Sequence, residues 1–289
     1  MTLASLHLAS PPALAQELAP GAYSPSPVGL NMLLIDYDHR GGEITLGPPA
    51  PVQSLSVVID TAFVAYVRTF GLAGRLANIG FAIPYSSGDL LFPRFDVTPL
   101  VHRSGLRDPA MRFSLNLAGI PAMDLKQFAA YRQKTNLGFS MLVFAPLGQY
   151  DPNRLINIGT NRWTFRPELG LTHAVGKWIL ETNAGVWFFT DNRNFFGGRV
   201  RSQDPVYALH FHVVRIFKPR MWLAVGATYY TGGTTSIDGL TNRDLQNDAR
   251  SGATFALPIS RRQSLKFSYS RGVVTRIGVD FQTVRIGYQ

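Results

Sequence analysis

The chain has 289 residues, of which 46% are hydrophobic and only 16% are charged, whereas soluble domains carry roughly 25% charged residues. Cysteine is absent, which excludes disulfides, thiolate catalysis and cysteine-based metal sites. No run of about 18 apolar residues occurs, which excludes a transmembrane helix. The formal charge is +10, but the basic residues are dispersed, which favours contact with anionic lipopolysaccharide or an electropositive pore over nucleic-acid binding.

The first 29 residues lack the alternation that is typical of strands. Residues 3–14 are mildly apolar and lead into Ala13-Leu14-Ala15, which resembles a signal-peptide cleavage site before Gln16. We therefore expect residues 1–15 to be the rear end of a truncated signal peptide; the alternative is an ordinary disordered tail. Residues 16–29 contain Pro and Ser without periodicity, and we expect them to form a periplasmic lead-in.

From residue 30 to residue 289, apolar and polar residues alternate with a period of two, which indicates half-buried strands. The clearest run is Met111 to Leu117, where every odd position is apolar and every even position is polar. Similar runs recur near 33–38, 57–68, 75–85, 136–145, 163–171, 178–188, 207–213, 221–231, 249–258, 265–270 and 283–288.

The connections between these runs alternate between long and short. Outer-membrane barrels have long external loops and short periplasmic turns, whereas a soluble sandwich, which alternation alone also permits, has no reason for this rhythm. We therefore predict an all-β fold over residues 30–289, a transmembrane antiparallel up-and-down β-barrel of about 12 strands. The long connections are 41–54, 86–109, 147–162, 191–204 and 232–248, and the short ones are 71–74, 174–177, 218–220 and 259–262.

Some segments depart from the rhythm. Residues 120–134 are longer than a turn, and Met123 to Tyr131 predicts a short helix; the hairpin near 273–278 is short, and Pro167 removes a ladder donor from its strand. We interpret these as local irregularities. Aromatic residues near strand ends predict an interfacial girdle, with the core of a soluble barrel as the alternative; they are Trp163, Trp178, Phe188, Phe189, Trp222, Tyr229, Tyr230 and Tyr288.

Charged and polar residues alternate with the apolar ones along most strands. Because a charge that faces lipid is unfavourable, we expect their side of the wall to be the lumen. Most of them are expected to form a ladder that closes the barrel, and the others to line a path for a solute. The predicted lumen-facing residues are Asp36, Asp60, Arg68, Arg112, Asn116, Arg166, Glu168, Glu181, His210, His212, Arg250, Lys266 and Arg285.

The sequence offers little support for metal or catalytic chemistry. His210 and His212 share one face, about 6–7 Å apart along a strand, and Glu181 is expected on a neighbouring strand. This spacing is common by chance, so we predict no metal site and no other cofactor. No G-x-S-x-G motif occurs and both histidines are expected to face inward, so we predict no catalytic residues and no enzyme activity.

Several segments resemble the outer-membrane transporter-like family named for the meta-pathway of phenol degradation. The resemblance extends from about residue 28 to the end and implies an outer-membrane barrel, placed near systems that degrade aromatic compounds, that passes hydrophobic small molecules. It implies no defined binding residues. The segments that carry it are DPAMRFSLNL at 108–117, APLGQYDP at 145–152, LINIGTNRW at 155–163, GVWFFTDN at 185–192 and YYTGG at 229–233.

We therefore expect a channel or transporter in the outer membrane of a Gram-negative bacterium, for small hydrophobic or aromatic, phenol-like compounds. About 12 strands predict a narrow or partly plugged lumen, constricted by the helix near 124–131 or the loop 86–109, and the inward basic residues predict a preference for anions. The expected partners are outer-membrane lipid and lipopolysaccharide, a small hydrophobic solute and the barrel-insertion machinery, with no nucleic acid. The alternatives are a non-transporting structural or surface-binding outer-membrane barrel, an outer-membrane enzyme and a soluble lipid-binding barrel.

Overall fold

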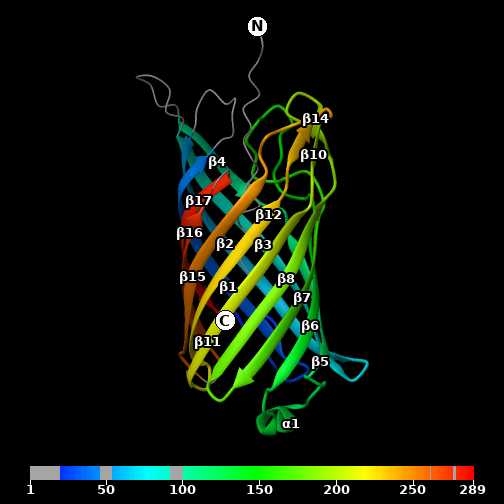
Figure 1. Cartoon of the computed structure of the whole chain (residues 1–289), viewed down its shortest axis with the longest axis vertical. Coiled ribbons are helices and arrows are strands. Elements are labelled where there is room, and N and C mark those ends of the chain that lie inside the picture. The colour runs from blue at the N-terminus through cyan, green and yellow to red at the C-terminus, as the bar shows by residue number, and fades with distance from the viewer. Residues whose placement is uncertain (1–19, 46–53, 92–99, 261, 276–277) are drawn as a thin grey trace.

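The computed structural model of the chain describes residues 20–45, 54–91, 100–260, 262–275 and 278–289. These residues form a tall barrel of antiparallel strands with one short helix below one end (Figure 1). The expected signal peptide, residues 1–15, lies outside the described residues. Within the described ranges, no helix is long and apolar enough to cross a membrane.

The barrel wall confirms the prediction of an antiparallel barrel of about 12 strands. The strands follow one another around the wall, β1 pairs with β17, and the pairing of β2 with β3 closes the ring. The wall strands are β1 (Asn31–Thr45), β2 (Ser54–Leu72), β3 (Arg75–Leu91), β5 (Ala110–Ala118), β6 (Thr135–Phe144), β7 (Thr164–Val175), β8 (Trp178–Phe189), β11 (Val206–Lys218), β12 (Met221–Gly232), β15 (Gln246–Pro258), β16 (Ser264–Val274) and β17 (Gly278–Tyr288).

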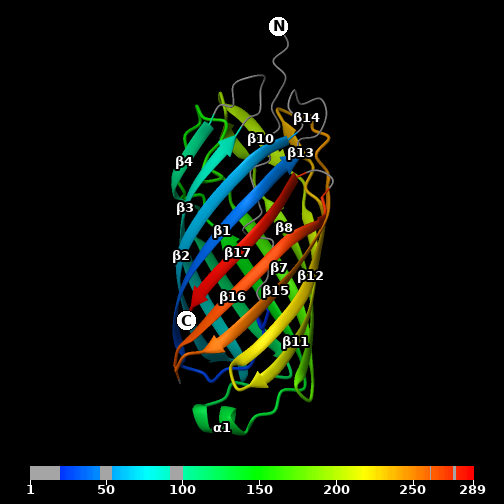
Figure 2. The same cartoon turned by 90° about the vertical axis from the view of Figure 1, so that its left-hand side faces the viewer.

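The longer connections gather at the end of the barrel opposite the helix (Figures 1 and 2). By the rule that external loops are long, this is the extracellular end. Four short strands form a second sheet there: β9 (Asn192–Phe195), β10 (Arg199–Gln203), β13 (Thr235–Ile237) and β14 (Leu240–Thr241). The interpretation of 86–109 as a long loop was wrong, because β3 continues to Leu91 and β4 (Leu100–Leu106) returns to pair with it.

The predicted short helix is present as α1 (Leu125–Ala130), and it lies below the barrel (Figure 1). A capping box starts it, because the Asp124 carboxylate accepts from the Gln127 N–H at 2.7 Å and the Gln127 side chain accepts from the Asp124 N–H at 2.9 Å. No residue of α1 is buried. The helix itself therefore does not constrict the lumen, contrary to one of our expectations.

The outer face of the wall is apolar, as a surface in contact with lipid requires. Large side chains such as Leu33, Ile83, Leu169 and Val225 are exposed there, whereas the inner face holds most of the buried polar and charged residues. Of the predicted aromatic girdle, Trp163, Trp178, Phe188, Tyr229 and Tyr288 are exposed and Trp222 is half-buried. Phe189 and Tyr230 instead point into the barrel, because they follow an outward residue by one position.

Candidate functional site

The inner face of the barrel carries a dense set of polar and ionic contacts. Most of the predicted lumen residues lie on it, and strands β5 to β8 bring several of them together. The predicted residues on the inner face are Asp36, Arg112, Asn116, Arg166, Glu168, Glu181, His210, His212, Arg250, Lys266 and Arg285.

The predicted inward orientation of Asp60 and Arg68 was wrong. On β2 the odd residues, such as Thr61 and Phe63, face inward, and Asp60 and Arg68 face outward. Asp60 is stabilised there by two outward neighbours, because the Tyr37 hydroxyl donates to it at 2.5 Å and His39 Nδ1 lies 2.8 Å away. Arg68 lies toward the end of β2, where the polar membrane interface tolerates a charge, whereas Asp60 lies closer to the middle of the strand.

Residues 20–29 lie inside the barrel instead of forming the periplasmic lead-in that their lack of periodicity suggested. Tyr23 is buried, and its hydroxyl donates to Glu168 Oε1 at 3.0 Å and lies 3.0 Å from Ser140 Oγ. The Asn136 side chain donates to the Tyr23 carbonyl at 3.2 Å. Burial, then the Glu168 carboxylate, raise the pKa of Tyr23 to about 12, so the hydroxyl stays protonated and can donate.

The wall is recessed where the Tyr23 ring meets it. Gly138 on β6 and Gly170 on β7 are cross-strand partners, and a Cβ placed on either one would overlap the Tyr23 ring. The guanidinium of Arg112 covers the ring from 5.6 Å. A ring seated between two glycines fixes the position of this segment, which we call the lumen plug (residues 20–30).

The plug is held at two further points. Near its start, the Gly21 N–H donates to both oxygens of Glu181, at 3.1 and 3.0 Å. Near its end, the Val28 N–H donates to the Met123 carbonyl at 2.8 Å. There Val28 packs against buried Leu76, Ile120 and Met123, so that the connection that carries α1 anchors the end of the plug.

The two histidines take different positions on this inner face. His210 is fully buried, with Nδ1 2.9 Å from Thr228 Oγ1. His212 Nδ1 lies 3.8 Å from Glu181 Oε2, but Glu181 is already occupied by the Gly21 N–H. Among the described residues, no group of three or more His, Cys, Asp or Glu side chains is arranged to hold a metal ion.

An ionic clasp joins the first and last strands. Asp38 on β1 is fully buried and pairs across the seam with Arg285 on β17. Both Nε and Nη2 of Arg285 donate to the Asp38 carboxylate, the second at 2.9 Å, and Arg40 Nη2 donates to it at 2.9 Å. This clasp ties β1 to β17 where the barrel closes.

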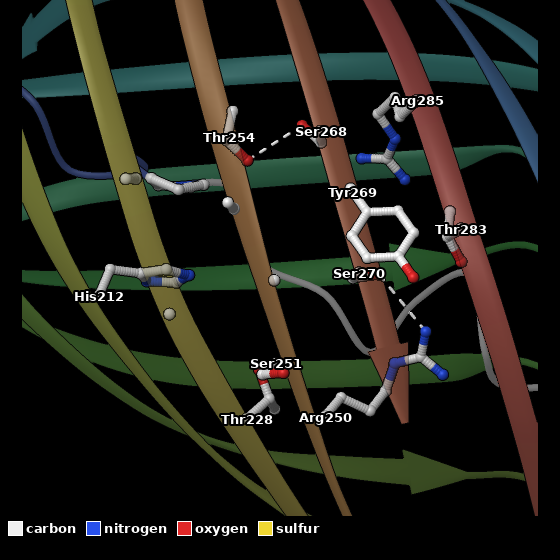
Figure 3. Close-up of a pocket in the computed structure, with 15 residues that line it drawn as sticks. His212, Thr228, Arg250, Ser251, Thr254, Ser268, Tyr269, Ser270, Thr283 and Arg285 are labelled. Atoms are coloured by element: carbon white, nitrogen blue, oxygen red, sulfur yellow. Dashed lines mark hydrogen bonds between the residues drawn. The ribbon is translucent and has the colours of Figure 1, made fainter. Parts of the chain in front are cut away.

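A polar cavity of about 70 Å³ remains between the plug and the wall of β11 to β17. Pro20 borders it on the side of the plug, and Arg250 and Arg285 approach it from β15 and β17 (Figure 3). Arg250 Nη2 donates to the Phe281 carbonyl at 2.8 Å and to Ser270 Oγ at 3.4 Å. Small hydroxyl residues such as Thr254 and Ser268 line the rest, so the cavity suits water and small ions.

A second, larger cavity of about 210 Å³ lies beneath the extracellular connections, and we call it the aromatic cavity. Its walls include Phe63, Phe144, Trp187 and Phe189. Its charged residues are Asp38, Arg107, Asp108, Arg162 and Arg285. Burial, and then the neighbouring charge of Arg40, lowers the pKa of Arg107. Burial, and then the neighbouring charge of Arg201, lowers the pKa of Arg162.

Arg285 lines both cavities. The polar cavity and the aromatic cavity therefore both border the clasp between β1 and β17.

Sequence reasoning missed part of this site. Asp38 alternates with Tyr37 in the same way as Asp36, so the alternation offered a signal for it. Tyr23, Arg107 and Arg162 lie in irregular segments, where the alternation of apolar and polar residues does not indicate the direction of a side chain.

The chain matches the family model described as "Putative MetA-pathway of phenol degradation" over residues 37–276. The COG4313 outer membrane channel from Pseudomonas putida F1 is a similar solved structure, with a TM-score of 0.81, 20% identity, and coverage of 94% of this chain and 98% of that one. Two autotransporter structures share the barrel fold. The transport unit of AIDA-I from Escherichia coli has a TM-score of 0.55 and 9% identity and covers 89% of each chain. The β domain of the Bordetella autotransporter BrkA has a TM-score of 0.52 and 13% identity and covers 89% of this chain and 98% of that one. No curated protein matches the sequence.

Proposed function

Since the chain belongs to the family described as "Putative MetA-pathway of phenol degradation", we propose that it is an outer-membrane channel for small hydrophobic or aromatic compounds. The observation that carries this proposal is the aromatic cavity, about 210 Å³ in volume and walled by Phe63, Phe144, Trp187 and Phe189. A dry apolar cavity of roughly 150 Å³ is enough to bind benzene. The aromatic cavity can therefore hold a single substituted ring.

The small size of the polar cavity determines how a solute would leave the aromatic cavity. At about 70 Å³ it accepts water but not an aromatic ring. Passage of a ring toward the periplasm then requires displacement of the plug around Pro20 and Tyr23. In this arrangement the pathway is closed to aromatic rings but not to water and small ions, and an aromatic solute is held in the aromatic cavity.

The proposal is tested by filling the aromatic cavity from its wall. Ala82 lines the cavity, and Ala82→Trp should reduce influx of a radiolabelled aromatic compound to the level of Gram-negative cells that lack the protein. Ala62, on the neighbouring strand, faces outward, so Ala62→Trp is the matched control and should preserve influx. Equal influx with and without the wild-type protein would refute the proposed function.

A further inference from the structure

We propose that the aromatic cavity binds small aromatic carboxylates, and that the guanidinium groups of Arg107 and Arg162 bind the carboxylate. The inference rests on the proposed function, since it names the chemical class of solute for the same cavity. It goes further by requiring an anionic group on the ring, which a cavity built only for neutral hydrocarbons would not need.

Arg107 lies near the carboxylates of Asp108 and Asp38 but forms an ion pair with neither of them. Its backbone N–H donates to the Pro84 carbonyl at 2.9 Å, which fixes the residue where the chain leaves β4. Its side chain lines the aromatic cavity and makes no hydrogen bond or ion pair with any residue that the structure describes. The donors of this guanidinium are therefore available to a solute.

Arg162 is held in place but only partly satisfied. Its Nη2 donates to Gln203 Oε1 at 2.5 Å, and its guanidinium carbon lies 4.3 Å from the centroid of the Phe189 ring. Its Nη1 is buried and has no hydrogen-bond partner in the described part of the chain. A buried donor without an acceptor is unfavourable, and a bound carboxylate oxygen would supply that acceptor.

The carboxylates of the cavity do not take this role. Asp38 accepts from Arg40 on its own strand and from Arg285 across the seam. The Asp108 oxygens accept instead from the backbone N–H groups of Gly148 and Thr160, both at 2.9 Å, and from the Thr160 hydroxyl at 2.6 Å. Arg285 and Arg40 thus engage Asp38, and backbone and hydroxyl groups engage Asp108, so that neither carboxylate pairs with Arg107 or Arg162.

The apolar side chains that line the cavity determine which kind of anion it can bind. Phe144, Trp187 and Phe189 give an apolar surface beside the two guanidinium groups. A phosphate or sulfate ion would also pair with the guanidinium groups, but its remaining oxygens would be desolvated against these rings. An aromatic carboxylate places its ring on the apolar wall, and its planar anion matches the planar guanidinium donors.

Calorimetric titration of the purified full-length protein in detergent micelles, corrected for empty micelles, tests the inference with benzoate, benzyl alcohol and acetate. Benzoate should bind at least about tenfold more tightly than either of the others. Arg107→Gln and Arg162→Gln should each reduce benzoate affinity by about tenfold and leave benzyl alcohol unchanged. Arg132→Gln, in the α1 connection, is the matched control and should bind benzoate as the wild type does.

The outcomes separate the two proposals. Equal affinities of the wild type for benzoate and benzyl alcohol would overturn the carboxylate inference and leave the proposed function standing. Acetate binding as tight as that of benzoate would also overturn the inference, since the rings would then contribute nothing. Binding of neither aromatic compound would contradict both proposals, and because these comparisons use the wild type, they do not depend on how the variants fold.

Discussion

At the scale of single residues, the barrel shows how position decides what a charge does. Asp38 and Asp60 lie on neighbouring strands, but Asp38 is 0% exposed and bound by two guanidinium groups, whereas the Asp60 side chain is 41% exposed and bound by Tyr37 and His39. Removing one partner of a buried ion pair leaves the other charge uncompensated, which an exposed pair avoids through water.

We therefore expect Asp38→Asn to lower the free energy of unfolding by about 3–5 kcal/mol. Asp60→Asn should lower it by no more than about 1 kcal/mol. Urea unfolding of the barrel in lipid vesicles measures both. A similar loss for the two variants would show that the clasp between β1 and β17 does not stabilise closure.

Tyr23 provides the second prediction at this scale. Tyr23→Ala removes the ring that is seated between Gly138 and Gly170, and Gly170→Val fills the recess and displaces the ring. Both variants should release the plug and raise single-channel conductance in planar bilayers. Tyr207→Ala, on the outer face, is the control and should conduct as the wild type does; unchanged conductance in both plug variants would mean that residues 20–30 do not limit the pathway.

At the scale of elements, each wall strand has one apolar face and one polar face, but alternation does not state which face is inside. We assigned the charged face to the lumen, and this assignment failed on β2, where the odd-numbered residues face inward and Asp60 and Arg68 face outward. The plug was missed for another reason. The plug has no alternation of apolar and polar residues, because its polar groups bond to side chains of the barrel wall, namely Glu168, Asn136 and Glu181. Only the closed fold brings these contacts together.

Strand β7 allows a test of the lipid-facing wall. Leu169 lies in the middle of the strand and Val175 at its end, on the same face, 51% and 55% exposed. Arginine at the midplane of a bilayer costs roughly 2–4 kcal/mol, but about 0–1 kcal/mol near an interface. Leu169→Arg should therefore reduce the folding yield in lipid vesicles, and Val175→Arg should not. Equal yields would place the apolar band of the membrane elsewhere along the barrel.

At the scale of the whole molecule, the net charge is +10, and part of the excess of basic side chains lies inside the barrel. Glu168 and Asp38 are engaged by arginines, whereas Arg107 and Arg162 face the aromatic cavity and Arg250 the polar cavity. Basic side chains thus outnumber acidic ones inside the barrel after the ion pairs are assigned. Two of these basic residues, Arg107 and Arg162, lie in connections, where the alternation of apolar and polar residues gave no prediction. Low-dielectric walls focus the field of such charges on a permeating ion.

We expect the reversal potential across a planar bilayer under a salt gradient to indicate anion selectivity. Arg250→Gln should shift the reversal potential toward zero, because it removes a charge from the narrower polar cavity, and Arg132→Gln should leave it unchanged. Cation selectivity of the wild type would contradict this prediction, and so would a complete lack of conductance.

The position of Arg285 couples the stability of this barrel to the shape of its lumen. The same guanidinium holds the seam between the first and last strands and borders both cavities. A substitution of Arg285 that widened either cavity would also weaken the closure of the barrel, because it would leave Asp38 without its partner across the seam. Arg107 and Arg162 take no part in the clasp, so the lining of the aromatic cavity can change at these two positions while the seam stays intact.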